Sequence, residues 1–215
     1  MKKKLILMCV AGLLAMTAII GGTLAGFNTS TESKGVTNIT VKALGIDILG
    51  TGVEGANYDK ITIDKGTPGG EMPLRQSVQN NVEEGYTLYT RVTIDKKWDN
   101  PELDASMIRL YAGNGESKQE LTQGITINDW IVWYSDAEQI IMYYTKPLAT
   151  TEVSNDFINS VSFEADMDNS YADATALISF SADAVQEIAA ADSIPSEWGV
   201  YPVFGDNGII NGIEE

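Results

Sequence analysis

Histidine is absent from this chain of 215 residues, and cysteine occurs once. Without histidine the chain lacks the usual general base of a hydrolytic triad and the side chain that most often binds zinc. The one cysteine, Cys9, lies in the apolar N-terminal run, so the residues that follow it contain no thiol nucleophile and no disulfide. These absences disfavour most hydrolases and zinc enzymes.

Basic side chains are also scarce, with 14 Lys and Arg against 30 Asp and Glu, which gives a formal net charge of −16. A field of this sign repels nucleic acid and anionic membrane surfaces, so we predict neither as a partner. The hydrophobic fraction of 44% and the charged fraction of 20% are those of a globular domain with a sizeable core. The length fits one ordinary domain or two small ones.

The first 25 residues have the layout of a secretory signal peptide. Three lysines at 2–4 precede an apolar run at 5–20, and the small residues Thr23 and Ala25 occupy the positions that a signal peptidase reads. Cleavage is therefore expected before Gly26. An uncleaved membrane anchor is the alternative, although the apolar run is shorter than the roughly 20 residues that span a bilayer. Cleavage would leave 11 basic against 30 acidic side chains, a net charge of −19, and would remove Cys9.

The rest of the chain alternates at the period of β-strands. The clearest case is 86–94, where Tyr86, Leu88, Val92 and Ile94 share one face and Thr87, Arg91 and Thr93 share the other. Similar short alternations occur at 39–43, 61–63, 161–165 and 175–182, and aromatic, β-branched runs occur at 130–134 and 139–144. Residues 130–144 predict a hairpin around a polar turn, and Asn100-Pro101 predicts a short helix over 100–111.

Seven or more strands without a long helical pattern predict an all-β, antiparallel β-sandwich. We assign it to 46–215, after an N-terminal segment at 26–45.

No candidate site for chemistry has a complete motif. Asp166, Asp168 and Asp173 open like a calcium loop, but Tyr171 and Leu177 stand where that loop needs Gly and Glu. A solvated turn is predicted, with weak calcium binding as the alternative. Residues 113–115 (GNG) predict a hairpin turn rather than a phosphate loop. The aromatic residues of 130–144 predict core and cross-strand pairs, with a carbohydrate platform as the alternative. We therefore predict no catalytic residue, no metal and no cofactor.

Several short segments, spread over nearly the whole chain, share their order with a known family. They are GGTLAGF at 21–27, MPLRQSV at 72–78, YTRV at 89–92, the Trp-then-Tyr-Tyr hairpin of 130–144 with KPLATT at 146–151, ADAVQ at 182–186 and WGV at 198–200. Together they resemble the TasA/camelysin group of secreted proteins, which depend on a SipW-type signal peptidase.

The resemblance implies a jelly-roll-like β-sandwich, exported to the cell surface or the extracellular matrix, that assembles into biofilm-matrix fibres. It implies donor-strand exchange between copies, with the N-terminal segment completing the sheet of a neighbour. The candidate donor residues are Phe27, Ile39, Val41 and Ala43. The implied partners are other copies of the chain and, during export, a SipW-type signal peptidase, with no stable membrane anchor after cleavage. Pairing of the segment within its own domain remains the alternative.

Two other functions stay open. A monomeric surface adhesin or glycan-binding module would need several exposed Trp or Tyr residues on one face. A camelysin-like metallopeptidase is disfavoured because a zinc site without histidine would rest on carboxylates alone. The preferred interpretation is a non-enzymatic fibre subunit, and the sequence leaves open whether it is the major or a minor component.

Overall fold

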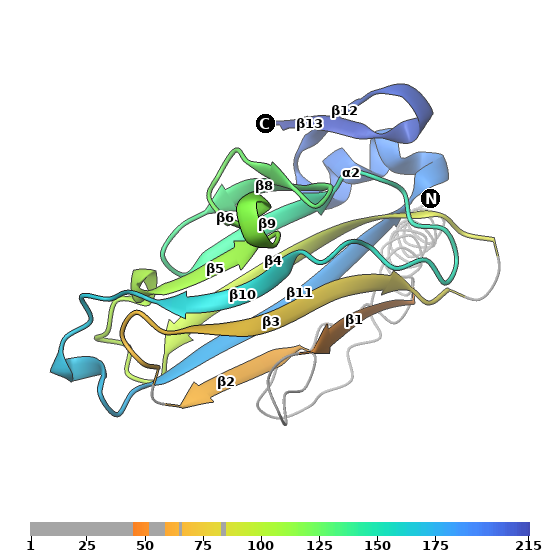
Figure 1. Cartoon of the computed structure of the whole chain (residues 1–215). Helices are drawn as coiled ribbons and strands as arrows, with labels where there is room; N and C mark the ends of the chain where they lie inside the picture. Colours follow the sequence, from red (N-terminus) through yellow and green to blue (C-terminus); the bar gives the residue numbers. More distant parts are fainter. Residues whose placement is uncertain (1–44, 52–58, 65, 83–84) are drawn as a thin grey trace, which may run out of the picture. The chain divides into compact units, whose positions relative to one another are not determined.

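The computed structural model describes residues 45–51, 59–64, 66–82 and 85–215, all of them within one compact unit, Asn38–Glu215. These residues form an antiparallel β-sandwich, which confirms the fold class predicted from the alternating pattern (Figure 1). The predicted signal peptide lies outside the described residues.

Two sheets make the sandwich, and every strand pair in them is antiparallel. Sheet A has five strands, in the spatial order β1 (Ile46–Thr51), β3 (Glu71–Asn80), β10 (Ile158–Phe163), β5 (Ile108–Ala112) and β6 (Gln119–Glu120). Sheet B has six, in the order β2 (Lys60–Asp64), β11 (Thr175–Gln186), β4 (Leu88–Trp98), β9 (Gln139–Tyr144), β8 (Trp130–Ser135) and β7 (Thr126–Ile127). The chain changes sheet at most connections, as in a jelly roll.

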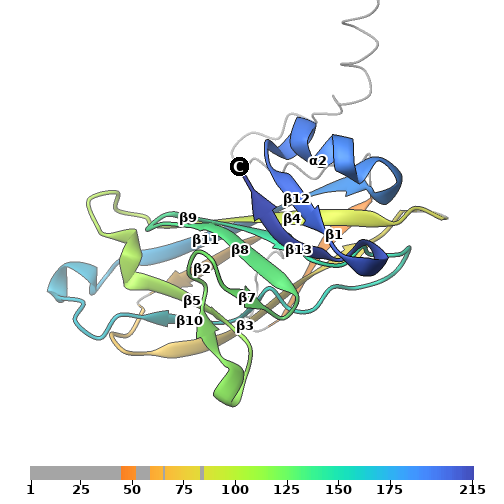
Figure 2. The ribbon, with the colours of Figure 1, turned by 90° about the horizontal axis from the view of Figure 1, so that it is seen from above.

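A third layer covers part of the outer face of sheet B. It consists of α2 (Ala190–Trp198) and the hairpin of β12 (Tyr201–Phe204) and β13 (Ile210–Glu214), which we call the C-terminal cap (Figure 2). A second hydrophobic cluster fills the interface, with Tyr89, Ile131, Tyr143 and Val185 from sheet B. Short 3-10 turns lie between other elements: η1 (Ala105–Met107), η2 (Gly115–Ser117), η3 (Asn169–Tyr171), η4 (Glu187–Ala189) and η5 (Asp206–Gly208).

The core between the sheets follows from the alternation. In β4 the side chains of Leu88, Val92 and Ile94 are fully buried. Phe157 joins the two sheets through its ring, whose centroid lies 5.6 Å from that of Trp130 and 5.7 Å from that of Phe180. Offset and edge-on aromatic pairs of this kind stabilise a core beyond the area they bury.

Two expectations from the sequence were wrong. Residues 100–111 do not form a helix: after η1 they enter β5, where Ile108, Leu110 and Ala112 are buried at period 2. The Asn-Pro signal marks a turn, and the two-residue period that follows it determines the structure. Tyr86 does not share the buried face of β4 but lies before the strand and is half exposed.

The pattern did not predict β3 or α2. The strand β3 contains Pro73 and several polar residues, and α2 is a short helix of nine residues. Ile194 of α2 is fully buried against sheet B, and Gly199 ends the helix in the left-handed conformation, at φ 70°.

Replacing Phe157 tests how much its aromatic contacts stabilise the core. We expect Phe157→Ala to lower the free energy of unfolding by about 3–5 kcal/mol, because it removes a fully buried ring and leaves a cavity. Chemical denaturation monitored by tryptophan fluorescence measures the change. The matched control is Ile188→Ala, at a side chain that is 93% exposed, where a change within about 0.5 kcal/mol is expected. Equal losses for the two variants would contradict the assignment of this core.

Candidate functional site

Every residue proposed from the sequence for processing or for the donor strand lies outside the described residues. This holds for Thr23, Ala25 and Gly26, and equally for Phe27, Ile39, Val41 and Ala43. A donor strand also needs an acceptor, which is a strand edge with backbone groups that can extend the ladder. The described residues contain such an edge.

The edge belongs to β11. On one side, β11 pairs with β4 along its length, from Ala176 with Trp98 to Gln186 with Leu88. On the other side it pairs with β2 only over Thr175–Ser179, and the last contact is a 2.8 Å hydrogen bond from the Phe180 N–H to the Asp59 carbonyl. Beyond Phe180, this second side has no ladder partner among the described residues. We call residues 181–186 of β11 the acceptor edge.

The direction of the backbone groups follows from the antiparallel pattern. Hydrogen-bonding groups of successive residues point to opposite sides of a strand. Because the N–H of Phe180 points toward β2, those of Ala182, Ala184 and Gln186 point the same way, along the acceptor edge. The side chains of Ala182 and Ala184 are among those packed at the core between the sheets.

An ion pair on the opposite face fixes the acceptor edge to β4 and to the C-terminal cap. The Arg91 guanidinium donates to one carboxylate oxygen of Asp183, over 2.6 Å from Nη2 and 3.2 Å from Nε. The same guanidinium lies 5.4 Å from the centre of the Trp198 ring in α2, an arrangement that allows a cation–π attraction. The acceptor edge is therefore held in place by contacts with both β4 and the C-terminal cap.

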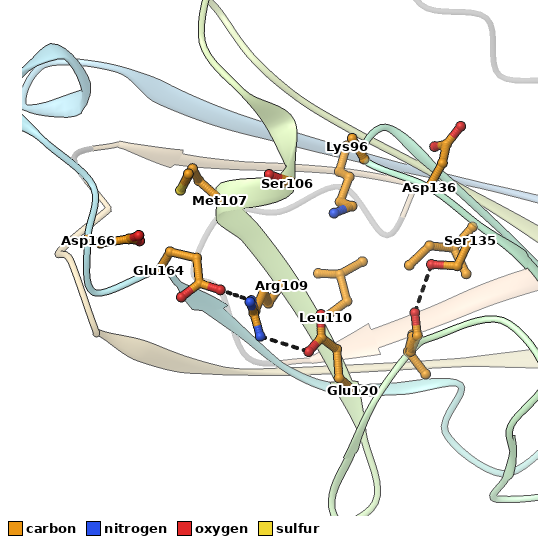
Figure 3. Close-up of a pocket in the computed structure, with 13 residues that line it drawn as sticks. Lys96, Ser106, Met107, Arg109, Leu110, Glu120, Ser135, Asp136, Glu164 and Asp166 are labelled. Carbon is orange, nitrogen blue, oxygen red and sulfur yellow. Dashed lines mark hydrogen bonds and ion pairs between the residues drawn. The ribbon is translucent and has the colours of Figure 1, made fainter.

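A polar pocket of about 410 Å³ lies elsewhere, between η1, β5, β6 and the β8–β9 turn (Figure 3). Its one buried cation is Lys96, which is 6% exposed. The Lys96 ammonium donates to the carbonyl of Ile108 over 2.7 Å and, more weakly, to that of Ala105 over 3.4 Å. Burial lowers the pKa of Lys96, and the nearby carboxylates of Glu120 and Asp136 partly offset that effect.

Three of the four acidic residues of this pocket, Glu120, Glu164 and Asp136, have partners within the protein. Arg109 forms ion pairs with Glu120 and Glu164 (Figure 3). The carboxylate of Asp136 accepts hydrogen bonds from the Tyr134 hydroxyl and from two backbone N–H groups of the β8–β9 turn, and these contacts lower its pKa. Because Lys96 belongs to sheet B and Ile108 to sheet A, the hydrogen bonds of this pocket link the two sheets.

The remaining candidates from the sequence have local structural roles in turns and in the core. Asp168 accepts hydrogen bonds from the backbone and hydroxyl of Ser170 and so caps η3, which places it in a turn. Residues 113–115 turn the chain between β5 and β6, as predicted. The predicted aromatic hairpin is β8–β9, and most of its rings are buried, with Tyr134 more exposed than the others. Across the described ranges, no three His, Cys, Asp or Glu side chains are grouped in a way that would hold a metal ion.

Comparisons with family models, with curated proteins and with solved structures found no match to this chain. In the part of the chain that the structure describes, no helix combines the length and the apolar character needed to cross a membrane.

The acceptor edge was not predicted from the sequence. The pattern indicated a strand at 175–182, whereas β11 continues to Gln186. One signal in the sequence could have indicated the acceptor edge. The alternation at 175–182 is longer than the one at 61–63, which forms its partner strand β2.

The buried ammonium makes a testable contribution to pH dependence. The pKa of Lys96 in the folded protein lies below its ordinary 10.5, so between the two values the unfolded chain binds more protons. The free energy of unfolding of the parent chain, relative to that of Lys96→Met, should therefore increase as pH rises through the range just below 10.5. Denaturation of both proteins at several alkaline pH values measures this. Subtracting the free energy of unfolding of Lys96→Met removes the opposing titration of the buried tyrosines, which both proteins share. A difference between the two free energies that stays constant with pH would contradict the prediction.

Proposed function

We propose that this protein is a secreted, non-enzymatic structural subunit, or a close accessory, of a fibre at the cell surface or in the biofilm matrix. Copies assemble when the N-terminal segment, residues 26–45, of one copy adds to the β-sandwich of another. The resemblance of the sequence to the TasA/camelysin group motivates this function.

The acceptor edge is the observation that carries the proposal. An unpaired side of a strand presents a row of N–H and C=O groups, and adding a strand to it forms main-chain hydrogen bonds without a specialised side chain. Among the described residues, the row begins beyond Lys60, the first residue of β2, and continues along the second half of β11. Its position inside sheet B, beside the core, means that an added strand would also bury one of its faces.

The candidate donor residues fit this edge by their spacing. Ile39, Val41 and Ala43 alternate with polar or basic residues, so a strand built from them has one apolar face. Facing the core beside Ala182 and Ala184, that apolar face would be removed from water. The polar residues of the donor would point to the outer face, where Asp183 and Arg91 lie.

Cleavage before Gly26 then acts as the switch for assembly. While the signal peptide remains attached, the donor segment stays at the membrane and cannot reach the sheet of a second copy. After cleavage by a SipW-type signal peptidase the segment is released. Retention at the cell surface follows from assembly itself.

Electron microscopy tests the proposal. We expect filaments from the chain that begins at Gly26 and none from a chain that keeps extra residues before Gly26. In the first chain, Ala184→Pro should abolish filaments. Proline removes an N–H that points outward from the acceptor edge, but it removes no hydrogen bond between β11 and β4. Ala184→Gly, which keeps the N–H, is the matched control.

Monodisperse particles from all of these proteins would remove polymerisation as an intrinsic property. In that outcome the monomeric adhesin becomes the leading function. Filaments from Ala184→Pro equal to those of the parent would show that strands are not added at this edge.

Salt and pH should control assembly because the cleaved chain carries a net charge of −19. Self-repulsion between copies weakens when salt screens the charges or when low pH protonates carboxylates. We therefore expect the soluble fraction after sedimentation to fall as ionic strength rises from about 0.01 to 0.5 M, where the Debye length shortens from roughly 30 Å to a few ångströms. A soluble fraction that stays constant across this range would refute the electrostatic part of the proposal.

A further inference from the structure

The start of β4 and the end of β11 lie at the same end of the sandwich (Figure 1), and an apolar surface patch lies there. It contains Tyr86, Ile188, Phe204 and Ile209, which are 50%, 93%, 37% and 36% exposed. We call these four residues the end patch. An isoleucine that is almost fully exposed in a turn gives no stability to its own domain, whereas a cluster of such side chains marks an interaction surface.

Hydrogen bonds and a ring contact bring the three segments of the end patch together. The Glu187 N–H donates to the Thr87 carbonyl over 2.9 Å, which holds the end of β11 beside the start of β4. The Tyr89 hydroxyl donates to the Gly208 carbonyl over 2.5 Å, and the Tyr89 ring lies 5.6 Å from that of Phe204. Tyr89 therefore fixes the turn of the β12–β13 hairpin against β4.

Carboxylates accompany the apolar side chains. A methyl group at Gly208 would lie 3.5 Å from a carboxylate oxygen of Glu187, so this carboxylate sits beside the hairpin turn. Asp206 lies in the same turn. Within the described residues, neither Glu187 nor Asp206 forms an ion pair. Burial, together with the negative charge of Glu187, raises the pKa of Tyr89. The surface therefore suits a group that is cationic and aromatic at once.

We propose that the end patch binds the new N-terminus, Gly26-Phe27, of a second copy of this chain. This inference rests on the proposed function and adds a second contact to strand addition. Cleavage before Gly26 creates an α-ammonium group directly beside an aromatic ring. The ammonium pairs with Glu187 and Asp206, and the Phe27 ring packs on Ile188 and Phe204.

The sequence of the segment agrees with this occupant. Phe27 is the only aromatic residue among the first 57, and no charged side chain lies between Gly26 and Glu32. The cation of a newly formed terminus is thus not neutralised by its immediate neighbours. Capture of an N-terminal amine is an established mode of peptide recognition.

The direction of the donor strand also agrees. If residues 39–43 add antiparallel to the acceptor edge, Ala43 lies toward the β2 end and Ile39 toward Gln186. The residues before Ile39 then continue past the end of β11, which is where Ile188 and the rest of the end patch lie. The eleven residues of 28–38 can extend over roughly 35 Å, so Phe27 can reach the patch without strain.

The two contacts make binding depend on processing. A chain that keeps its signal peptide has an uncharged amide before Gly26, so it lacks the ammonium that the carboxylates would pair with. The end patch therefore distinguishes cleaved from uncleaved chains by charge.

Disulfide cross-linking tests the occupant, since the chain from Gly26 has no cysteine. We expect a mixture of Phe27→Cys and Ile188→Cys chains to give disulfide-linked heterodimers under a mild oxidant during assembly. The matched control replaces Ile188→Cys by Tyr134→Cys, a 38% exposed residue on β8, and should give little product. Equal yields from the two mixtures would overturn the inference.

The double variant Phe27→Cys/Ile188→Cys identifies the source of the segment. At a dilution where no filaments form, a disulfide within single chains would show that each patch holds its own N-terminus, which overturns docking by a second copy.

Assembly thresholds separate this inference from the proposed function. We expect Phe27→Ala and Ile188→Glu each to raise the lowest concentration that forms filaments by roughly tenfold or more, the scale of losing one buried aromatic contact. Phe27→Tyr, which keeps the ring, should stay near the parent value. Filaments with unchanged thresholds and no specific cross-link would overturn the end patch and leave strand addition intact. Absence of filaments and cross-links under all conditions would remove both.

Discussion

The ladder between β11 and β4 is the interaction on which the rest of this structure depends. It runs from Ala176 paired with Trp98 to Gln186 paired with Leu88 and occupies the interior of sheet B. One face of the two strands supplies Val92, Ile94, Ile178 and other side chains of the main core. The opposite face carries Arg91 and Asp183, whose ion pair lies under Trp198 of the cap. Losing this ladder would therefore separate all three layers.

The sequence predicted the parts of the fold that repeat a simple period. Alternation in β4 and β11 identified most of their buried side chains, because each strand lies between the main core and a wetter face, and the aromatic, β-branched runs predicted the β8–β9 hairpin. It failed at residues 100–111, where a local Asn-Pro signal competed with a short alternation over Ile108–Ala112 and the tertiary pairing of β5 with β10 prevailed. It also failed for β3, whose Pro73 and buried Gln76 do not resemble a strand until the neighbouring strands are known.

Much less of the candidate site was predictable, because the acceptor edge is a property of two strands and not of one. No residue in 181–186 is unusual in itself. Among the described residues, β2 pairs with only five residues of β11, Thr175–Ser179, whereas β11 has twelve and continues to Gln186. The end patch has the same character, since Tyr86, Ile188 and Phe204 are far apart in the sequence and meet only through the contacts of Tyr89 and Glu187.

The proline in β12 has a consequence for the geometry of any assembly. Pro202 has no N–H to donate at the edge of the β12–β13 hairpin, and β6 and β7, each at one of the two borders of its sheet, are only two residues long. These borders are poor templates for further strands. In the proposed assembly, each subunit would accept a strand at one place and donate one from a single segment, so the polymers would grow as unbranched filaments. Thicker fibres would then form by lateral association of filaments and not by branching.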